Sequence, residues 1–211
     1  MPRDEPTSLR CAAFVDGQNL FRAAKEAFGY TFPNYDPQGL AKSIAASRGW
    51  QLVAAHFYTG IPDHSDDPFW HGFWTAKLGV LGTRGVVTFS RALRYRNETV
   101  KLPDGTKTVA LVRREKGIDV RIALDVVRLA RVNAFDVALL FSQDQDLSEV
   151  AVEVRRISRH EERWIKIASA FPSSDRSRNL RGINGTDWIP IDRSLYDACI
   201  DTNDYRPKAE S

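Results

Sequence analysis

The sequence CAAFVDGQNL at residues 11–20 combines a short apolar run with an acid, a glycine and the start of a helical pattern. A run with apolar residues at every position is typical of a strand that is buried on both faces of a parallel sheet. The run stops at Asp16, and the helical pattern that follows ends at Gly29, a residue type that favours a helix C-terminus. A buried strand that leads directly into a helix indicates the first unit of an α/β protein.

The same alternation of strand and helix patterns continues along the chain. Aspartate followed by proline, at Asp36-Pro37 and at Asp67-Pro68, is typical of an N-cap followed by the first helical residue. We expect five central strands, at residues 11–15, 52–58, 86–89, 137–141 and 164–171, and a short strand at 188–191 in the tail. Strands that alternate with helices predict a mainly parallel five-stranded sheet with helices on both faces.

Length and composition limit the class of protein. The chain has 211 residues, of which 43% are hydrophobic and 27% are charged, so we expect one globular domain over residues 1–211. The core would span about residues 11–171, with a C-terminal extension at 172–211. No signal peptide or bilayer-spanning run is apparent, and the two cysteines, Cys11 and Cys199, suit a reducing compartment. We therefore set aside secreted, membrane and zinc-finger proteins and expect a cytoplasmic location.

Positive charge is concentrated between residues 91 and 116. This segment carries a net charge of +5 within a chain whose net charge is +3, so the remaining residues sum to −2. Two strand-like stretches within it flank the turn Pro103-Asp104-Gly105, which predicts an inserted β-hairpin. The basic hairpin suggests a polyanionic partner, although a solvated hairpin face accounts for the charge equally well.

Acidic residues follow two of the predicted strands. Asp16 follows the first strand, while Asp144 and Asp146 follow the strand at 137–141, with Ser142 between that strand and the acids. The carboxyl ends of parallel strands share one edge of a sheet, which is where α/β proteins bind ligands. A structural alternative for Asp146, and to a lesser extent for Asp144, is to cap the helix that follows.

The helix predicted after residue 116 contributes a further acid. At 100° per residue, Asp119 lies on one stripe with apolar residues such as Ile122 and Val126, so we expect it to point inward near the end of the sheet. Asp125 lies about 240° away and shares its stripe with Arg121 and Arg128, which predicts a surface ion pair.

Four carboxylates at one edge would repel one another. Each pair of charges at ~4 Å is unfavourable by about 4 kcal/mol at an effective dielectric constant of 20. A divalent cation offsets that repulsion, and an all-carboxylate site favours Mg²⁺ or Mn²⁺ over zinc. The four histidines show no metal-ligand spacing, and the sequence has neither a GxSxG nor a GxxxxGK[ST] motif. Metal-assisted chemistry on a phosphoryl group is therefore the prediction that these residues favour.

Three segments together resemble the NYN domains, a branch of the PIN-like nuclease superfamily. They are FVDGQNL, KGIDVRIALD at residues 116–125, and LLFSQDQDL ending at residue 147, and the resemblance spans about residues 11–171. It implies a Rossmann-like, three-layer PIN-like α/β fold with a metal-dependent ribonuclease site. By motif, Asp16, Asp119 and Asp144 look like the catalytic, metal-binding acids, with Asp146 as a fourth metal ligand.

The resemblance also implies supporting roles. Asn19 would orient Asp16 or bind a metal-bound water, Lys116 would position phosphate, and Ser142 matches the small hydroxyl residue before the last acids. One residue departs from the usual Ser-Gly-Asp pattern, because Gln143 occupies the position of the glycine. If that position needs a positive φ, glutamine would cost about 1 kcal/mol or more. Its amide would otherwise be available to contact substrate.

We therefore expect an endoribonuclease that cuts single-stranded or structured RNA with bound Mg²⁺ or Mn²⁺. The alternatives are a non-catalytic RNA-binding or regulatory module on the same fold, and a phosphatase or nucleotide hydrolase. The basic residues expected to grip the RNA backbone are Arg91, Arg94, Arg96, Arg113 and Arg114.

Aromatic residues recur in the helix predicted after Asp67. Phe69, Trp70, Phe73 and Trp74 follow helical spacing, which core packing explains more simply than base stacking does. Any of these aromatics left exposed would also allow a homodimer.

Overall fold

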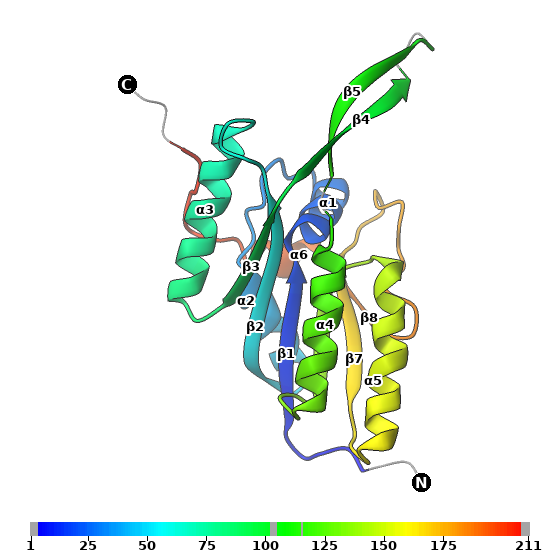
Figure 1. The fold of residues 1–211 in the computed structure, drawn as a ribbon. Helices are drawn as coiled ribbons and strands as arrows, with labels where there is room; N and C mark the ends of the chain where they lie inside the picture. Colours follow the sequence, from blue (N-terminus) through cyan, green and yellow to red (C-terminus); the bar gives the residue numbers. More distant parts are fainter. Residues whose placement is uncertain (1–3, 102–104, 115, 208–211) are drawn as a thin grey trace.

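The protein has an α/β fold built on one parallel sheet of six strands, in the order β3-β2-β1-β6-β7-β8 (Figure 1). The structure is a computed structural model that describes residues 4–101, 105–114 and 116–207. The sheet strands are β1 (Leu9–Asp16), β2 (Trp50–Ile61), β3 (Val87–Ala92), β6 (Val137–Phe141), β7 (Lys166–Pro172) and β8 (Asp187–Ile191). The predicted fold class is confirmed. The tail strand β8 extends the five expected central strands to six by pairing in parallel with β7.

Helices cover both faces of the sheet. The helices are α1 (Gly17–Phe28), α2 (Pro37–Ser47), α3 (Pro68–Thr83), α4 (Ile118–Arg131), α5 (Ser148–His160) and the short α6 (Arg193–Asp197). Helices α1, α2, α3 and α6 contribute buried side chains to one apolar cluster, and α4 and α5 contribute to a second. The sheet separates the two clusters because alternate residues of β1 face opposite ways, with Val15 in the first cluster and Phe14 in the second.

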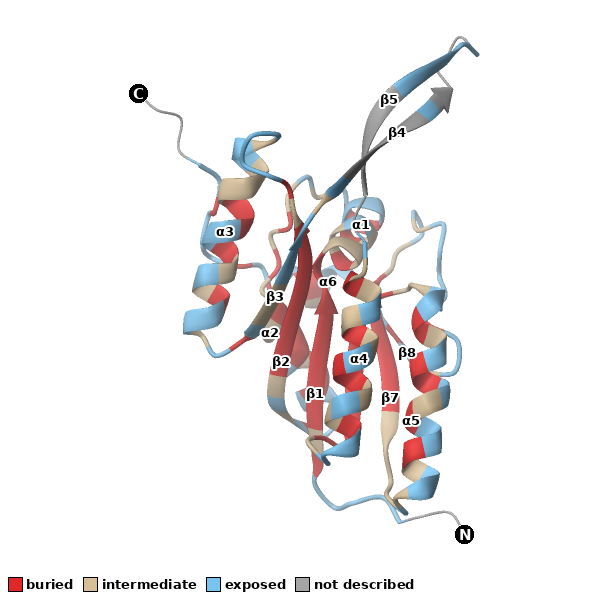
Figure 2. Cartoon of the chain, in the orientation of Figure 1, coloured by how far each residue is buried: buried red, intermediate tan, exposed pale blue. Residues whose placement is uncertain are grey.

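The central strands are the most buried part of the fold. All five residues of β6 are buried, as is β1 from Cys11 onward, and the sheet forms the interior of the molecule in Figure 2. This burial explains why these strands are continuously apolar rather than alternating. Among the described residues, no helix combines the length and apolar character that crossing a bilayer requires.

Three helix boundaries lie where the sequence predicts them, at Asp36, Asp67 and Gly29. Asp36 accepts a hydrogen bond from the Gln38 backbone N–H at 3.0 Å, and Asp67 accepts one from the Trp70 backbone N–H at 3.1 Å. Gly29 ends α1 with φ of 84°, a left-handed conformation that glycine adopts without steric cost. Local capping chemistry therefore sets the starts of α2 and α3 and the end of α1.

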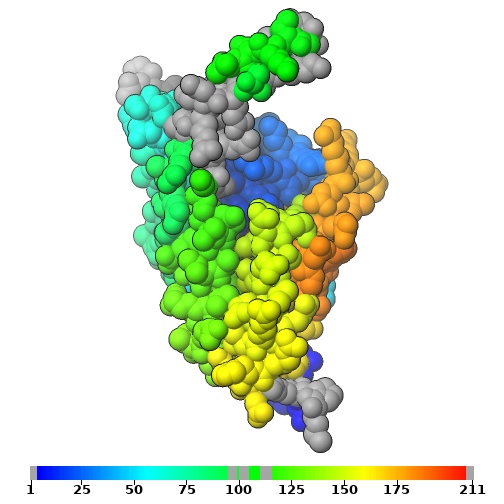
Figure 3. Space-filling view, turned by 45° about the vertical axis from the view of Figure 1, so that its right-hand side comes forward, coloured from blue at the N-terminus to red at the C-terminus, as the bar shows by residue number. Residues whose placement is uncertain are grey.

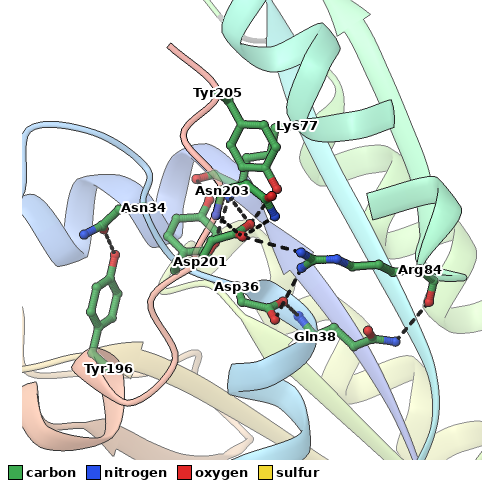
Figure 4. A network of polar contacts seen from close by, with 11 residues as sticks. Asn34, Asp36, Gln38, Lys77, Arg84, Tyr196, Asp201, Asn203 and Tyr205 are labelled. Carbon is green, nitrogen blue, oxygen red and sulfur yellow. Dashed lines mark hydrogen bonds and ion pairs between the residues drawn. The ribbon is translucent and has the colours of Figure 1, made fainter. Parts of the chain in front are cut away.

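A buried polar network attaches the end of the chain to α3 (Figure 4). Lys77 of α3 is fully buried, and its Nζ donates to the Tyr35 carbonyl at 2.8 Å and lies 3.4 Å from the Asp201 carboxylate. Burial lowers the pKa of Lys77 to about 8, although the Asp201 charge opposes that shift. The Tyr205 hydroxyl also donates to Asp201, at 2.7 Å. The segment after α6 is thus an integral part of the packed structure.

The predicted hairpin projects from the carboxyl edge of the sheet (Figures 1 and 3). Its strands, β4 (Arg94–Lys101) and β5 (Lys107–Arg114), form a separate antiparallel pair. Of the predicted turn, Pro103 and Asp104 lie outside the described residues. The hairpin connects β3 to α4 and therefore arises next to the edge where the acidic residues were expected.

Candidate metal and phosphodiester site

The candidate site lies at the carboxyl edge of the sheet between β1 and β6. The strand order reverses between these two strands, because the chain builds β2 and β3 on one side of β1 and β6, β7 and β8 on the other. Val15 and Phe141 are register partners, so Asp16 and Ser142 follow paired residues on neighbouring strands. Parallel α/β sheets bind their ligands at such a switch point.

Asp16 is buried at this edge and caps α1. One of its carboxylate oxygens accepts a hydrogen bond from the Asn19 backbone N–H at 2.9 Å, and the residue is only 7% exposed. Burial raises the pKa of Asp16 to about 6, with the Asn19 N–H and the Arg22 charge opposing the shift and the Asp144 charge adding to it. Asp16 and Asp144 are therefore close enough to interact electrostatically.

The other buried aspartates have cationic partners. Of the four aspartates that the structure describes as buried, Asp125 is paired with Arg121 at 2.8 Å, Asp136 with Arg10 at 2.9 Å, and Asp201 with Lys77. In each of these three, burial alone would raise the pKa, but the hydrogen bonds and nearby positive charge lower it overall. Asp16 forms no ion pair within the described residues, so its buried negative charge lacks this compensation.

Hydrogen bonds shape the loop after β6 that carries Asp144. The Ser142 hydroxyl oxygen accepts from the Asp144 backbone N–H at 3.1 Å, and Asp144 in turn accepts from the Asp146 backbone N–H at 3.0 Å. Asp144 thereby caps the single 3₁₀ turn η1 (Gln145–Leu147). The sequence suggested Asp146 as the better candidate for capping, but the cap falls on Asp144 because the chain makes this turn before α5 begins.

Asn19 joins the ends of the two strands. Its side-chain oxygen accepts from the Gln143 backbone N–H at 3.0 Å, while its own backbone N–H donates to Asp16. The contact that holds Asp16 is therefore made by the Asn19 backbone, and its side chain holds the loop that carries Asp144.

Asp119 and Asp146 line a neighbouring cavity. Both line a cavity of about 470 Å³ between α4 and α5, whose walls are largely apolar and include Val120 and Leu124. Asp119 is half-buried on the first turn of α4, on the side of the helix that faces α5. Ile122, Val126 and Ala130 of the same stripe are buried, whereas Asp119 faces the cavity rather than the end of the sheet where it was expected.

The predicted site acids divide between two places rather than forming one cluster. Asp16 and Asp144 interact at the switch point, and Asp119 and Asp146 share the cavity between α4 and α5. Within residues 4–101, 105–114 and 116–207, no three acidic, histidine or cysteine side chains stand together in a metal-binding arrangement. The separation follows from packing, because Asp16 caps α1 on one face of the sheet and Asp119 belongs to α4 on the other.

Asp125 was predicted to form a surface ion pair, and the structure corrects its location. Its partners Arg121 and Arg128 are those predicted, at 2.8 and 3.4 Å. The carboxylate is nevertheless buried, and it also accepts from the Tyr58 hydroxyl at 3.0 Å. The guanidinium of Arg121 also lies over the Phe89 ring, 4.8 Å from its centre. Asp125 is therefore a structural residue.

Two glutamines of the same loop hold a distant segment, which sequence reasoning missed. The Gln143 amide donates to the carbonyls of Asn179 and Arg181 at 3.0 and 2.9 Å. Gln145 donates to the Gly182 carbonyl at 3.0 Å and accepts from the Asn184 backbone N–H at 3.1 Å. In Figure 3 this orange segment borders the blue surface of α1. Because these partners lie more than 30 residues away, no local sequence pattern indicates them.

The backbone at Gln143 does not need the positive φ that a glycine would allow. Among the described non-glycine residues, only Asn133 and Glu162 have positive φ, so Gln143 adopts ordinary backbone geometry. Glutamine is therefore unstrained at the position where the family pattern has glycine. Its amide is occupied by the 179–181 segment rather than being directed toward a substrate.

The basic residues surround the start of α4. Arg91 is exposed, lies 5.6 Å from the centre of the Phe89 ring, and approaches Gly117, where an added Cβ would come within 2.6 Å of its guanidinium. Lys116 and Arg94 are also exposed. The side chains of the other predicted RNA-binding residues lie outside the described part of the structure, namely those of Arg96, Arg113 and Arg114.

The donor chemistry of this edge fits a hard divalent cation. The candidate ligands are carboxylate oxygens, and the neighbouring side chains that touch the loop offer hydroxyl and amide oxygens, the donors that Mg²⁺ and Mn²⁺ prefer. A cation beside Asp16 would also supply the positive charge that the other buried aspartates obtain from arginine or lysine.

Comparison with known proteins identifies a family for most of the chain. The model of the family described as NYN domain matches residues 10–177. No curated protein matches the chain significantly.

Two solved structures illustrate the structural matches. The chain is similar to a protein of unknown function, VPA0982, from Vibrio parahaemolyticus RIMD 2210633, at 20% identity over 90% of this chain and 97% of that one, with a TM-score of 0.47. It is also similar to Acinetobacter baumannii MurG, at 8% identity over 86% of this chain and 45% of that one, with a TM-score of 0.34.

Proposed function

The chain belongs to the NYN domain family of the PIN-like nuclease superfamily, and we propose that it is a metal-dependent endoribonuclease. Family membership indicates a nuclease-type, RNA-related function. Specifically, the protein would hydrolyse RNA phosphodiester bonds at the carboxyl edge of the sheet between β1 and β6, with Mg²⁺ or Mn²⁺ bound.

The observation that supports this proposal most strongly is the environment of Asp16. Its carboxylate is buried at the switch point of the sheet, interacts with a second carboxylate, and forms no ion pair in the described structure. The three other buried aspartates are all neutralised by arginine or lysine. A buried acid without such compensation is costly to folding and is typical of functional sites.

The residues proposed to hold the cation are Asp16, Asp119 and Asp144, with Asp146 as a fourth ligand. When bound, the cation would activate water and offset negative charge on the phosphoryl oxygens. Asn19 and Ser142 would keep the loop after β6 in place and thereby fix Asp144 relative to Asp16. Lys116, at the start of α4, would contact a substrate phosphate.

The basic hairpin would hold the RNA backbone. Arg91 and Arg94 are exposed near its base, and Arg96 and Arg113 lie on its paired strands, with Arg114 at the end of β5. Phosphate contacts of this kind fix the position of a nucleic acid without reading its sequence. The free, buried cysteines Cys11 and Cys199 suit the cytoplasm as the expected location.

The test is an RNA cleavage assay with added metal. The purified protein should cleave RNA in millimolar Mn²⁺ or Mg²⁺ and stop in EDTA, and Asp16→Asn, Asp119→Asn and Asp144→Asn should each lose activity while remaining folded. Asp175→Asn is the control, because it makes the same change at an exposed aspartate. Unchanged cleavage by the three site variants would refute the assignment.

The second candidate is a non-catalytic RNA-binding module. The observation that favours it is that, among the described residues, the predicted site acids do not come together as one three-ligand group. The same assay separates the two functions, because a binding module would retain RNA and leave it intact at every metal concentration.

A further inference from the structure

A pocket of about 220 Å³ lies between α1, the helix that Asp16 caps, and α3. Pro62 and Leu93, which follow the carboxyl ends of β2 and β3, place it at the same edge as the proposed metal site. The residues that line the pocket are Gln18, Phe21, Arg22, Pro62, Trp70, Trp74 and Leu93.

The walls of the pocket are aromatic. Phe21 and Trp70 are half-buried, so each presents part of its ring to the surface, and Trp74 is only 2% exposed. The indole N–H of Trp74 has no hydrogen-bond acceptor among the described residues. A buried tryptophan N–H is ordinarily paired, so an unpartnered one in a residue that lines a pocket points to a ligand as its acceptor.

Polar groups from the first turns of α1 complete the pocket. The Gln18 amide nitrogen lies at the limit of hydrogen bonding, 3.5 Å from the Gly60 carbonyl, and its amide oxygen accepts no hydrogen bond within the described residues. Arg22 is exposed and forms no hydrogen bond or ion pair there, yet its charge acts on Asp16. A single turn of helix thus brings the Gln18 amide and the exposed charge of Arg22 to the wall of the pocket.

We propose that this pocket binds one unpaired nucleobase of the RNA, with Arg22 contacting the phosphate between that nucleotide and the bond that is cut. A flat aromatic ring with hydrogen-bonding edges matches a slot walled by Phe21 and Trp70 and supplied with donors by Gln18 and Trp74. This inference rests on the proposed ribonuclease function and specifies its substrate as single-stranded RNA. A base in a duplex would have to leave its stack before it entered.

The test compares two strands of equal length and charge. Fluorescence anisotropy in EDTA would measure binding of a short single-stranded RNA and of an abasic ribose-phosphate strand. Base stacking on an aromatic side chain contributes about 1–3 kcal/mol, so the wild-type protein should bind the base-bearing strand roughly 10-fold tighter. Trp70→Ala should abolish most of that preference, and Trp70→Phe, which keeps a ring, should restore it.

Trp164→Ala is the matched control, because Trp164 is also half-buried but precedes β7 at the opposite edge of the sheet. It should leave the preference unchanged. Equal binding of both strands by the wild-type protein, or equal preference in Trp70→Ala and wild type, would overturn the pocket proposal. Metal-dependent cleavage of the same RNA would then still uphold the ribonuclease function, whereas failure to bind either strand and to cleave would reject both.

Discussion

The side-chain oxygen of Asn19 accepts a hydrogen bond from the Gln143 backbone N–H at 3.0 Å, across the point where the strand order of the sheet reverses. The Asn19 backbone N–H simultaneously holds the Asp16 carboxylate. One residue at the start of α1 therefore ties together the acid at the end of β1 and the loop that carries Asp144. The relative position of these two acids depends on this bridge.

Replacing Asn19 should impair activity more than stability. Asn19→Ala removes the acceptor that holds the loop after β6, so we expect Mn²⁺-dependent RNA cleavage to fall about 10- to 100-fold, the range seen when groups that orient metal ligands are lost. Apparent Mn²⁺ affinity, measured from the metal dependence of cleavage, should fall with it.

Asn34→Ala is the control for Asn19→Ala. It also removes one side-chain acceptor, which bonds the Tyr196 hydroxyl at 2.9 Å, but it lies beyond the other end of α1. The two variants should have similar Tm values, and only Asn19→Ala should lose activity. Equal activity in the two would contradict the positioning role.

Asp16 should make the stability of the metal-free protein depend on pH. The pKa of Asp16 is raised from its ordinary value of 3.8 to about 6 in the folded protein, so the folded state binds more protons between these values. Its contribution to stability is therefore full below pH 3.8 and is lost as the pH rises through about 6. In EDTA at pH 7.5, Asp16→Asn should stabilise the protein by up to about 3 kcal/mol, and by less at pH 5.

The matched control for that experiment is Asp136→Asn. Asp136 is also buried, but its ion pair with Arg10 outweighs burial and lowers its pKa, so its ionised form stabilises the fold. Urea unfolding at pH 7.5 should show that Asp136→Asn destabilises the protein while Asp16→Asn stabilises it. Destabilisation of similar size in both would show that the Asp16 charge is compensated after all.

The hairpin arginines should control the salt dependence of RNA binding. If Arg94 and Arg96 contact phosphates, replacing both with alanine should weaken binding and reduce the slope of log K against log salt by about 1.4, because each phosphate contact with a single strand contributes about 0.7. Arg48 and Arg159 provide a control of equal charge at the helix ends near the opposite edge of the sheet. If both double variants change the slope equally, then net charge, not the hairpin, determines binding.

The buried ion pair beneath the C-terminal segment should be important for stability. Asp201→Asn would leave the buried ammonium of Lys77 without a carboxylate partner and would also remove one partner of Arg84, so we expect a loss of about 3–5 kcal/mol in urea unfolding. Asp204→Asn makes the same change three residues away, where the aspartate is exposed and paired with Arg206, and should leave the unfolding midpoint unchanged. Equal midpoints for Asp201→Asn and wild type would show that the pair contributes little.

Local chemistry accounts for the parts of the fold that the sequence predicts well. The boundary between β1 and α1 is readable because an apolar run ends at Asp16, which caps the helix itself. The helix starts at Asp36 and Asp67 follow from the same short-range hydrogen bonds. The strand at residues 188–191 is also readable, but its place as the sixth strand is not, because pairing with β7 is a long-range contact.

The site is harder to predict because its contacts join distant segments. Asp125 is buried beside the hydroxyl of Tyr58, which lies 67 residues earlier, and a helical wheel shows only neighbours within the same helix. The Gln143 amide donates to a backbone carbonyl 36 residues later in the chain. The sequence alone therefore could not explain why glutamine replaces the glycine of the family pattern. Whether Asp144 or Asp146 caps the next turn depends on one hydrogen bond within the loop.

Calorimetric titration of Mn²⁺ into the metal-free protein at pH 7.5 tests the central claim most directly, because it asks whether the buried charge of Asp16 is neutralised by a cation. We predict saturable binding that is lost in Asp16→Asn, is retained in Asp175→Asn, and weakens as the pH falls below about 6, where Asp16 takes up a proton. Binding of equal strength in the wild-type protein and Asp16→Asn, or no binding in either, would contradict the account.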